Sequence, residues 1–315
     1  MDSILQPLTF GQILDRTFRL CRANVKSFLS ISVVPAVGLT IATLAILGTI
    51  LPVALPNHGT PPSVSPATIV LIVTVSLLAM IGAMVVFAVY QPAACYAALQ
   101  ADLGIPTRFR EAYATAWSKR GRYVWLTVLK GLIVAGPFYG TFILVAVLSI
   151  LRARTAGSAV GDLLVVVVPL LMLVYVCGMV YAVFMMIRLA FATPACVAED
   201  LPAYAAIKRS MQLSRHAKGR IFLVALVVYA ANYAAMMIFE IVFGAIAGVG
   251  SLLFVGTHSG LVIQIVAASV FGLLFMGGLL LLMGAMWSSF TVAFTVVYRD
   301  QRLRIDPRPE PGVPA

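Results

Sequence analysis

The chain has 315 residues, of which 62% are apolar and 10% are charged, and its formal net charge is +11. About a quarter of the residues in a soluble domain are charged, so this chain lacks the polar residues needed to cover a surface in water. Asp, Glu, Lys and Arg are absent from residues 27–101. The basic residues lie beside apolar segments without aromatic base readers, which argues against nucleic acid as a partner. We therefore expect an all-α integral membrane protein.

Six apolar segments are each long enough to cross a bilayer as a helix, which takes about 20 residues. They cover residues 28–55, 67–96, 123–151, 163–191, 221–248 and 261–298. Turn-rich segments at 56–62, 152–162 and 248–260 separate the two members of each consecutive pair. The sequence thus predicts six transmembrane helices arranged as three hairpins in a single polytopic domain, residues 1–300.

The basic residues predict the orientation of the chain. All but four of the 22 Lys and Arg residues precede the first span, join one hairpin to the next, or follow the last span. Loops on the cytoplasmic side of a membrane carry the excess of Lys and Arg. We therefore expect a cell-membrane protein with both termini in the cytoplasm, and a disordered, proline-rich cytoplasmic tail at 301–315.

An amphipathic helix is predicted before the first span. At 100° per residue, its apolar residues fall on one arc, and the opposite arc carries Asp15, Arg16, Arg19, Arg22 and Lys26. An apolar stripe backed by a basic face is typical of a helix lying in the membrane interface. The alternative is a surface helix packed on a protein core.

The same frame recurs twice along the chain. The class of residue repeats at offsets of 99 and 193, so that Ile13 corresponds to Ala112 and to Ala206. Each hairpin also leads to an aspartate, namely Asp102, Asp200 and Asp300. These spacings predict three repeat units at about 8–102, 107–200 and 203–300, each with one interfacial helix followed by one hairpin. Transporters are typically built from inverted repeats, whereas these units run parallel.

Four stretches carry a resemblance to a known family. They are residues 7–20 (PLTFGQILDRTFRL), 193–199 (TPACVAE), 206–213 (AIKRSMQL) and 297–306 (VYRDQRLRID). Together they resemble the membrane-domain family named after glycerophosphoryl diester phosphodiesterases, over essentially the whole chain. The resemblance implies the membrane part without a catalytic domain. The chain departs from the family pattern at Arg299, between Tyr298 and Asp300, where the family more often has an aromatic or small residue.

The sequence offers no residues for catalysis. Phosphodiester hydrolysis requires His, Glu or Asp ligands for a divalent cation, but His58, His216 and His258 have no carboxylate at ligand spacing. Phosphate-binding loops and nucleophile elbows are also missing. Four widely separated cysteines predict neither a disulfide framework nor a zinc site. We expect a protein that is not an enzyme and that uses no cofactor or metal.

Three ionisable residues lie within the predicted spans. Arg188 and Lys130 are close enough to an inner end to extend their charges toward the interface. Glu240 is nearer the outer half of its span, so we do not expect it to pair with Lys130. Intramembrane charges are functional candidates by default, and Lys130 and Glu240 form the candidate intramembrane polar site. For Glu240 the alternatives are a solute or proton pathway and a structural, hydrogen-bonded carboxyl.

Small residues within the spans predict close contacts between helices. They are Gly136, Gly140, Gly244, Gly248, Gly277, Gly278 and Gly284.

The leading functional hypothesis is a non-enzymatic membrane module that organises protein partners or lipids at the inner leaflet. Arg16, Arg19, Arg209 and Arg215, expected to face water, are the candidate contacts for anionic lipids or partners, because each basic residue near an anionic surface contributes about 1 kcal/mol. Ordinary topology-setting charge is the alternative for these four. The expected partners are membrane lipids and proteins, a second copy of the chain included. A small-solute transporter and a membrane anchor for a separate catalytic chain are the alternative functions.

Overall fold

The computed structural model describes residues 8–54, 65–154, 159–215, 217–256 and 261–305. Every regular element in these ranges is a helix. The six long helices are α2 (Val25–Ala54), α3 (Pro66–Asp102), α5 (Arg120–Arg154), α6 (Ala159–Arg188), α9 (Lys218–Gly256) and α10 (Leu261–Ile305). The four short ones are α1 (Phe10–Ala23), α4 (Phe109–Ser118), α7 (Ala192–Ala198) and α8 (Ala203–Ser214).

All six long helices contain a segment that is long and apolar enough to cross a membrane. Large apolar side chains point outward along them, among them Val166 (69% exposed), Val180 (67%) and Ile241 (69%). Water would penalise such surface by about 25 cal/mol per Å², whereas hydrocarbon would not. The predicted all-α class and the six predicted spans are therefore confirmed at the level of helix length and composition.

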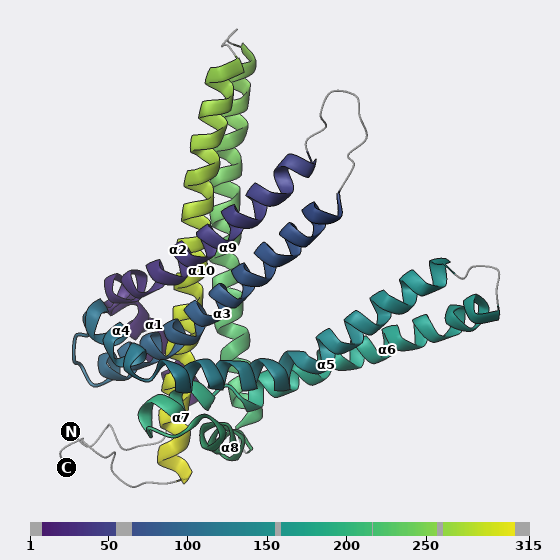
Figure 1. Ribbon diagram of the computed structural model, residues 1–315. Coiled ribbons are helices and arrows are strands. Elements are labelled where there is room, and N and C mark those ends of the chain that lie inside the picture. Colours follow the sequence, from purple (N-terminus) through teal and green to yellow (C-terminus); the bar gives the residue numbers. More distant parts are fainter. Residues whose placement is uncertain (1–7, 55–64, 155–158, 216, 257–260, 306–315) are drawn as a thin grey trace.

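The long helices pack in consecutive pairs, α2 with α3, α5 with α6 and α9 with α10. Figure 1 shows the three pairs diverging from a common region that contains the short helices. Helix α10 also packs against α2 and α3, so the first and third pairs are joined along part of their length. The second pair contacts the rest mainly through α3 and α8.

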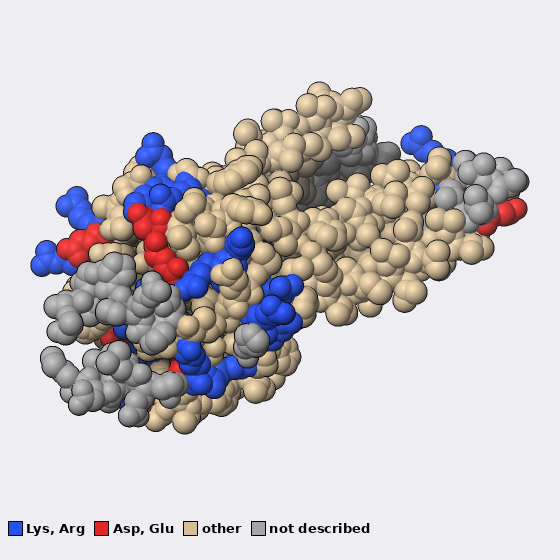
Figure 2. Space-filling view, turned by 90° about the horizontal axis from the view of Figure 1, so that it is seen from below, with Lys and Arg blue, Asp and Glu red and all other residues tan. Residues whose placement is uncertain are grey.

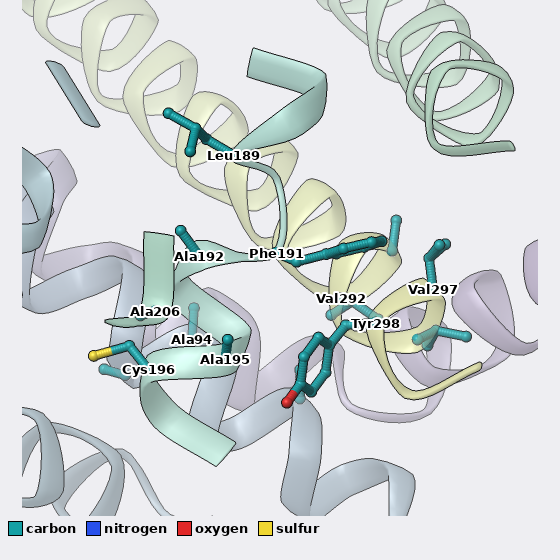
Figure 3. Packing of buried hydrophobic residues seen from close by; sticks show 14 of the residues in the cluster. Ala94, Leu189, Phe191, Ala192, Ala195, Cys196, Ala206, Val292, Val297 and Tyr298 are labelled. Carbon is teal, nitrogen blue, oxygen red and sulfur yellow. The ribbon is translucent and has the colours of Figure 1, made fainter. Parts of the chain in front are cut away.

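The buried core lies where the three pairs converge. Its largest fully buried side chains include Tyr90, Leu126, Phe191, Leu213 and Tyr298, which come from five different helices or their ends. Figure 3 shows Phe191 and Tyr298 beside the alanines of α3 and α7, where small side chains let the backbones approach closely. The core thus fixes the ends of the long helices relative to the short ones.

Corresponding positions of three short helices are buried in this core. Helix α1 buries Ile13 and Thr17, α4 buries Ala112 and Ala116, and α8 buries Ala206 and Ser210 among others. These are the same positions in the frame of 99 and 193 residues. Each helix therefore turns the same face toward protein, while Phe18, Phe109 and Trp117 remain exposed.

Two of the seven predicted contact glycines are tightly packed. A Cβ atom on Gly284 would lie 2.6 Å from Cβ of Ser32, and one on Gly278 would lie 3.0 Å from the ring of Phe239. Within the described part of the chain, the others have no atom of another element within 4 Å of that position; they are Gly136, Gly140, Gly244, Gly248 and Gly277.

The C-terminal boundary of the last helix corrects one expectation. Residues 301–305, assigned above to a disordered tail, continue α10 as far as Ile305. Side chains in this turn bind acidic groups, since Arg304 pairs with Asp300 and Arg302 with Glu199. These ion pairs hold the turn helical. The rest of the predicted tail lies outside the described residues.

Candidate functional site

Charged side chains gather at the end of the molecule that contains the short helices. We call this end the polar base and define it as α1, α4, α7 and α8 with the adjoining ends of the long helices that carry Asp102, Arg122, Arg220 and Asp300. Figure 2 shows basic and acidic residues over this end, an uncharged surface beyond it, and a few charges at the far tip. The polar base therefore carries most of the charged side chains that could bind a ligand or a partner.

Asp102, at the end of α3, connects three helices. Its side chain is 3% exposed, and Oδ1 accepts a hydrogen bond of 2.6 Å from Nε of Arg16 in α1. Oδ2 is paired with the guanidinium of Arg299 in α10. A buried carboxylate requires such partners, because its desolvation costs several kcal/mol. Asp102 therefore fixes the first short helix to the last long one.

Asp300 makes a similar connection on α10. Its side chain is fully buried, and Oδ2 accepts from Arg220 of α9 at 2.7 Å and from Arg304 at 2.9 Å. Oδ1 accepts the backbone N–H of Leu8 at 2.7 Å, and Arg304 donates to the Leu8 carbonyl at 2.9 Å. This carboxylate therefore holds the segment that enters α1 against the end of α10.

Glu199 follows α7 and connects it to α8 and α10. The hydroxyl of Tyr298 donates to its Oε1 at 2.6 Å, Arg209 of α8 lies 3.2 Å from Oε2, and Arg302 lies 3.7 Å from Oε1. Its side chain is 15% exposed. The carboxylates of Asp102, Glu199 and Asp300 are therefore already bound by side chains of the same chain.

Asp200 differs because it lies at the surface. Its side chain is 61% exposed and accepts from Lys119 and Arg122, each at 2.6 Å. The hydrogen bond from Lys119 is the largest cause that lowers the pKa of this carboxyl below its ordinary value, and Arg122 adds to it. The residue has a φ of +51°, a left-handed conformation that aspartate tolerates better than most residues.

Two of these ion pairs follow the repeat spacing. Arg122 at the start of α5 binds Asp200 beyond the end of α6, and Arg220 at the start of α9 binds Asp300 near the end of α10. In both cases an arginine that begins a pair of long helices binds an aspartate at or beyond the end of that pair. The first unit departs from this pattern: Asn24 stands 78 residues before Asp102, the separation between Arg122 and Asp200, and Asp102 binds Arg16 and Arg299 instead.

The four arginines proposed as lipid or partner contacts fall into two classes. Arg16 and Arg209 are only 23% and 21% exposed in their side chains and bind Asp102 and Glu199. This corrects the expectation that both face water. Arg19 and Arg215 are exposed, and neither has an ion-pair partner among the residues with described positions. Their role in binding stays a prediction.

The candidate intramembrane pair is not brought together. Lys130 on α5 donates from Nζ to the hydroxyl of Thr193 in α7 at 3.2 Å, so its charge is directed toward the core beside α7. Glu240 lies exposed on α9, and its carboxylate has no hydrogen bond or ion pair within the described ranges. The two residues do not form an ion pair within the described ranges.

Residues suited to metal or redox chemistry do not cluster in the described part of the chain. No group of three or more His, Cys, Asp or Glu residues there could hold a metal ion. The four cysteines are free thiols, and burial raises the pKa of Cys21 in α1 to about 11. A thiol with a raised pKa is a poor nucleophile at neutral pH. The three histidines lie outside the described residues.

A second group of cations lies where α6 meets the start of α9. Cζ of Arg188 and Nζ of Lys218 lie 5.7 Å and 4.9 Å from the centre of the Phe184 ring. Ser210 and Ser214 of α8 donate to the Arg188 carbonyl at 2.8 Å and 3.2 Å, which fixes the end of α6. Sequence reasoning considered Arg188 alone and had no signal that Lys218 would reach the same ring.

Comparison with known proteins adds no assignment: no family model, no curated protein and no solved structure matches the chain. The class is set by the fold alone, which contains six helices capable of crossing a membrane.

Proposed function

We propose that the chain is a non-enzymatic, multi-pass membrane module whose polar base organises lipids or protein partners at the inner leaflet. The observation that carries the proposal is the distribution of charge at this base. Asp102, Glu199 and Asp300 are already bound by internal arginines, whereas a set of basic side chains remains exposed: Arg19, Arg22, Lys26, Arg110, Arg120, Lys208 and Arg215. An anionic surface is the complement of such a base.

The arrangement in the membrane is part of this proposal. The three helix pairs would be transmembrane hairpins, and the excess of Lys and Arg at the polar base would place that base and both termini in the cytoplasm. The shared buried face of α1, α4 and α8 and the repeated Arg122–Asp200 and Arg220–Asp300 pairs support three repeat units. The short helices would lie near the headgroups, packed on the core by their buried face. The resemblance to the phosphodiesterase membrane-domain family agrees with this arrangement.

Lipid enrichment around the full chain tests the function. The protein would be extracted from membranes of mixed composition into polymer-bounded nanodiscs, and the fraction of anionic lipid in its discs compared with that in the bulk membrane. We expect enrichment that decreases when Arg19, Arg22 and Lys26 are replaced by Gln. The matched control replaces Arg152 and Arg154, which lie at the opposite ends of the long helices, and should leave the enrichment unchanged.

Purification of the chain from the same membranes in mild detergent, followed by mass spectrometry, tests whether it binds protein partners. A protein recovered in a fixed ratio with the chain would identify a partner, and a separately encoded catalytic chain would establish the anchor alternative. Recovery of the chain alone, together with an unenriched lipid shell, would refute the proposal.

Solute transport is the second candidate, favoured by the position of Glu240. This carboxylate lies exposed on α9 between Ile238 and Ile241, which are also exposed. A charge facing hydrocarbon is costly and therefore often functional. Uptake into proteoliposomes by the parent chain and by Glu240→Gln would test this, since equal uptake would remove Glu240 from any pathway.

A further inference from the structure

The second cation group combines two positive charges with one aromatic ring. Arg188 comes from the last turn of α6 and Lys218 from the first turn of α9, yet both approach Phe184. A cation over an aromatic ring is attracted to the negative face of the ring's π-system. Two cations against the same ring also repel each other, and this repulsion is strong where water is scarce.

These cations have no anion among the described residues. Neither Arg188 nor Lys218 forms an ion pair there, although acidic residues bind arginines elsewhere in the base. The Nε atom of Arg188 is buried and has no hydrogen-bond acceptor in the same part of the chain. Because a buried N–H donor without an acceptor is costly, the Nε–H of Arg188 lacks a partner that an anion bound to this partly exposed side chain would supply.

The Arg188 side chain points toward the apolar surface of α6, so an anion bound to it would lie where the polar base meets that surface. Side chains on a helix lean toward its N-terminus, and α6 runs toward the polar base. Arg188 therefore leans back along α6 over Phe184, which is one turn earlier, or about 6 Å along the axis. Its charge therefore lies between the polar base and the exposed apolar surface of α6, and its extension toward the membrane interface stays a prediction.

Apolar side chains flank the cations on both helices. On α6, Val180 is 67% exposed, Val183 52% and Phe184 41%, and on α9, Phe222 is 45% and Leu226 49% exposed. A ligand bound to Arg188 and Lys218 would therefore have an anionic group beside an apolar portion. The first N–H groups of α9 begin at Lys218 and add the positive end of a long helix dipole.

From these observations we infer that Arg188 and Lys218, over the ring of Phe184, bind the phosphate of one anionic phospholipid, whose acyl chains lie along α6 and α9. This inference rests on the proposed function, because the site faces the inner leaflet only in the proposed orientation. It goes further by replacing a diffuse attraction with one site between the second and third helix pairs. A basic pocket between transmembrane helices is a recurrent way to hold a phospholipid headgroup.

Native mass spectrometry of the full chain tests the site. The delipidated protein in detergent is titrated with phosphatidylglycerol or with phosphatidylcholine, and retained lipids are counted. We expect the parent chain to retain one phosphatidylglycerol in preference to phosphatidylcholine. Replacing Arg188 and Lys218 together by Gln should weaken this retention at least tenfold. Lys218→Gln alone, at the partly exposed start of α9, should give an intermediate loss and serves if the double variant does not fold.

The control variant replaces Arg152 and Arg154, an exposed basic pair in the last turn of α5 at the end of the molecule opposite the polar base, and it should keep the bound lipid. Equal loss in this control would show diffuse attraction, which overturns the site and leaves the proposed function intact. Equal retention of both lipids by the parent chain would also overturn the site. A competition experiment adds inorganic phosphate at millimolar concentration. Complete displacement of the lipid by free phosphate would show that the site binds a soluble anion and would overturn the lipid assignment. An acidic protein recovered at this site would equally refute a lipid ligand.

Discussion

Replacing Gly284 by alanine should separate α10 from α2, because the new methyl group would overlap the partner helix. Its Cβ would lie 2.6 Å from Cβ of Ser32 and 3.2 Å from the Ser32 carbonyl oxygen, which belongs to helical backbone and cannot rotate away. The overlap would also disturb a set of buried hydrogen bonds at the crossing of α2 and α10. Ser32 and Ser288 hydroxyls lie 3.0 Å apart, and Tyr90 binds Ser288 at 2.8 Å and donates to the Gly284 carbonyl at 3.0 Å.

The size of the effect follows from these contacts. Overpacking of this kind costs about 1 to 3 kcal/mol, and each weakened hydrogen bond adds about 0.5 to 1.5 kcal/mol. At about 2 to 4 °C per kcal/mol for a large domain, the apparent Tm of Gly284→Ala in detergent should fall by several degrees. Unfolding can be followed with a thiol-reactive fluorophore, because the thiols of Cys95 and Cys196 are buried in the folded chain and react once it unfolds. A Cys177→Ala background removes the exposed thiol.

Gly277→Ala is the matched control, since no atom of another described element lies within 4 Å of the Cβ added to this glycine on the same helix. Alanine favours a helix over glycine by about 1 kcal/mol, so the control should be unchanged or more stable. Adding Ser32→Gly to Gly284→Ala removes the nearest atom and should restore part of the loss. Equal Tm values for the two alanine variants would refute the packing of α2 against α10.

The remaining predictions concern single charges, each measured by the same thermal assay. Arg220→Met should lower the Tm more than Arg122→Met, because the first leaves the fully buried Asp300 with fewer partners whereas Asp200 is 61% exposed; a reversed order would contradict the assigned burial. The pKa of Asp200 is depressed, so its stabilising effect is complete above the unfolded value and is lost as the pH falls below the ordinary value of 3.8. The Tm difference between the parent and Asp200→Asn should therefore shrink in that acidic range, and a constant difference would show that the pKa is not depressed. Glu240→Gln should leave the Tm unchanged because its carboxylate is exposed on α9, and a marked loss would reveal a structural partner.

The candidate binding residues are harder to predict than the spans, because basic side chains on one helix differ in how far the fold exposes them. Arg16 and Arg19 belong to the same amphipathic helix, yet one is bound by the buried Asp102 and the other is exposed. Helical periodicity placed both on the polar arc. Only the position of α3 and α10 against α1 decides which guanidinium meets a carboxylate. The repeated aspartates were visible in the sequence, but their partners are distant in the chain and had no local signal.

The six apolar helices, their order and the grouping of charged residues between them could be predicted from the amino-acid sequence, because helix formation and hydrophobicity depend on composition and on the spacing of a few residues. The packing of the helices determines which charges are neutralised inside the polar base, which glycines lie at a helix crossing, and that Arg188 and Lys218 contact the same ring. Those outcomes depend on how helices distant in the chain approach one another. Distances of a few ångströms then determine whether a side chain binds a neighbour or is left to bind a ligand.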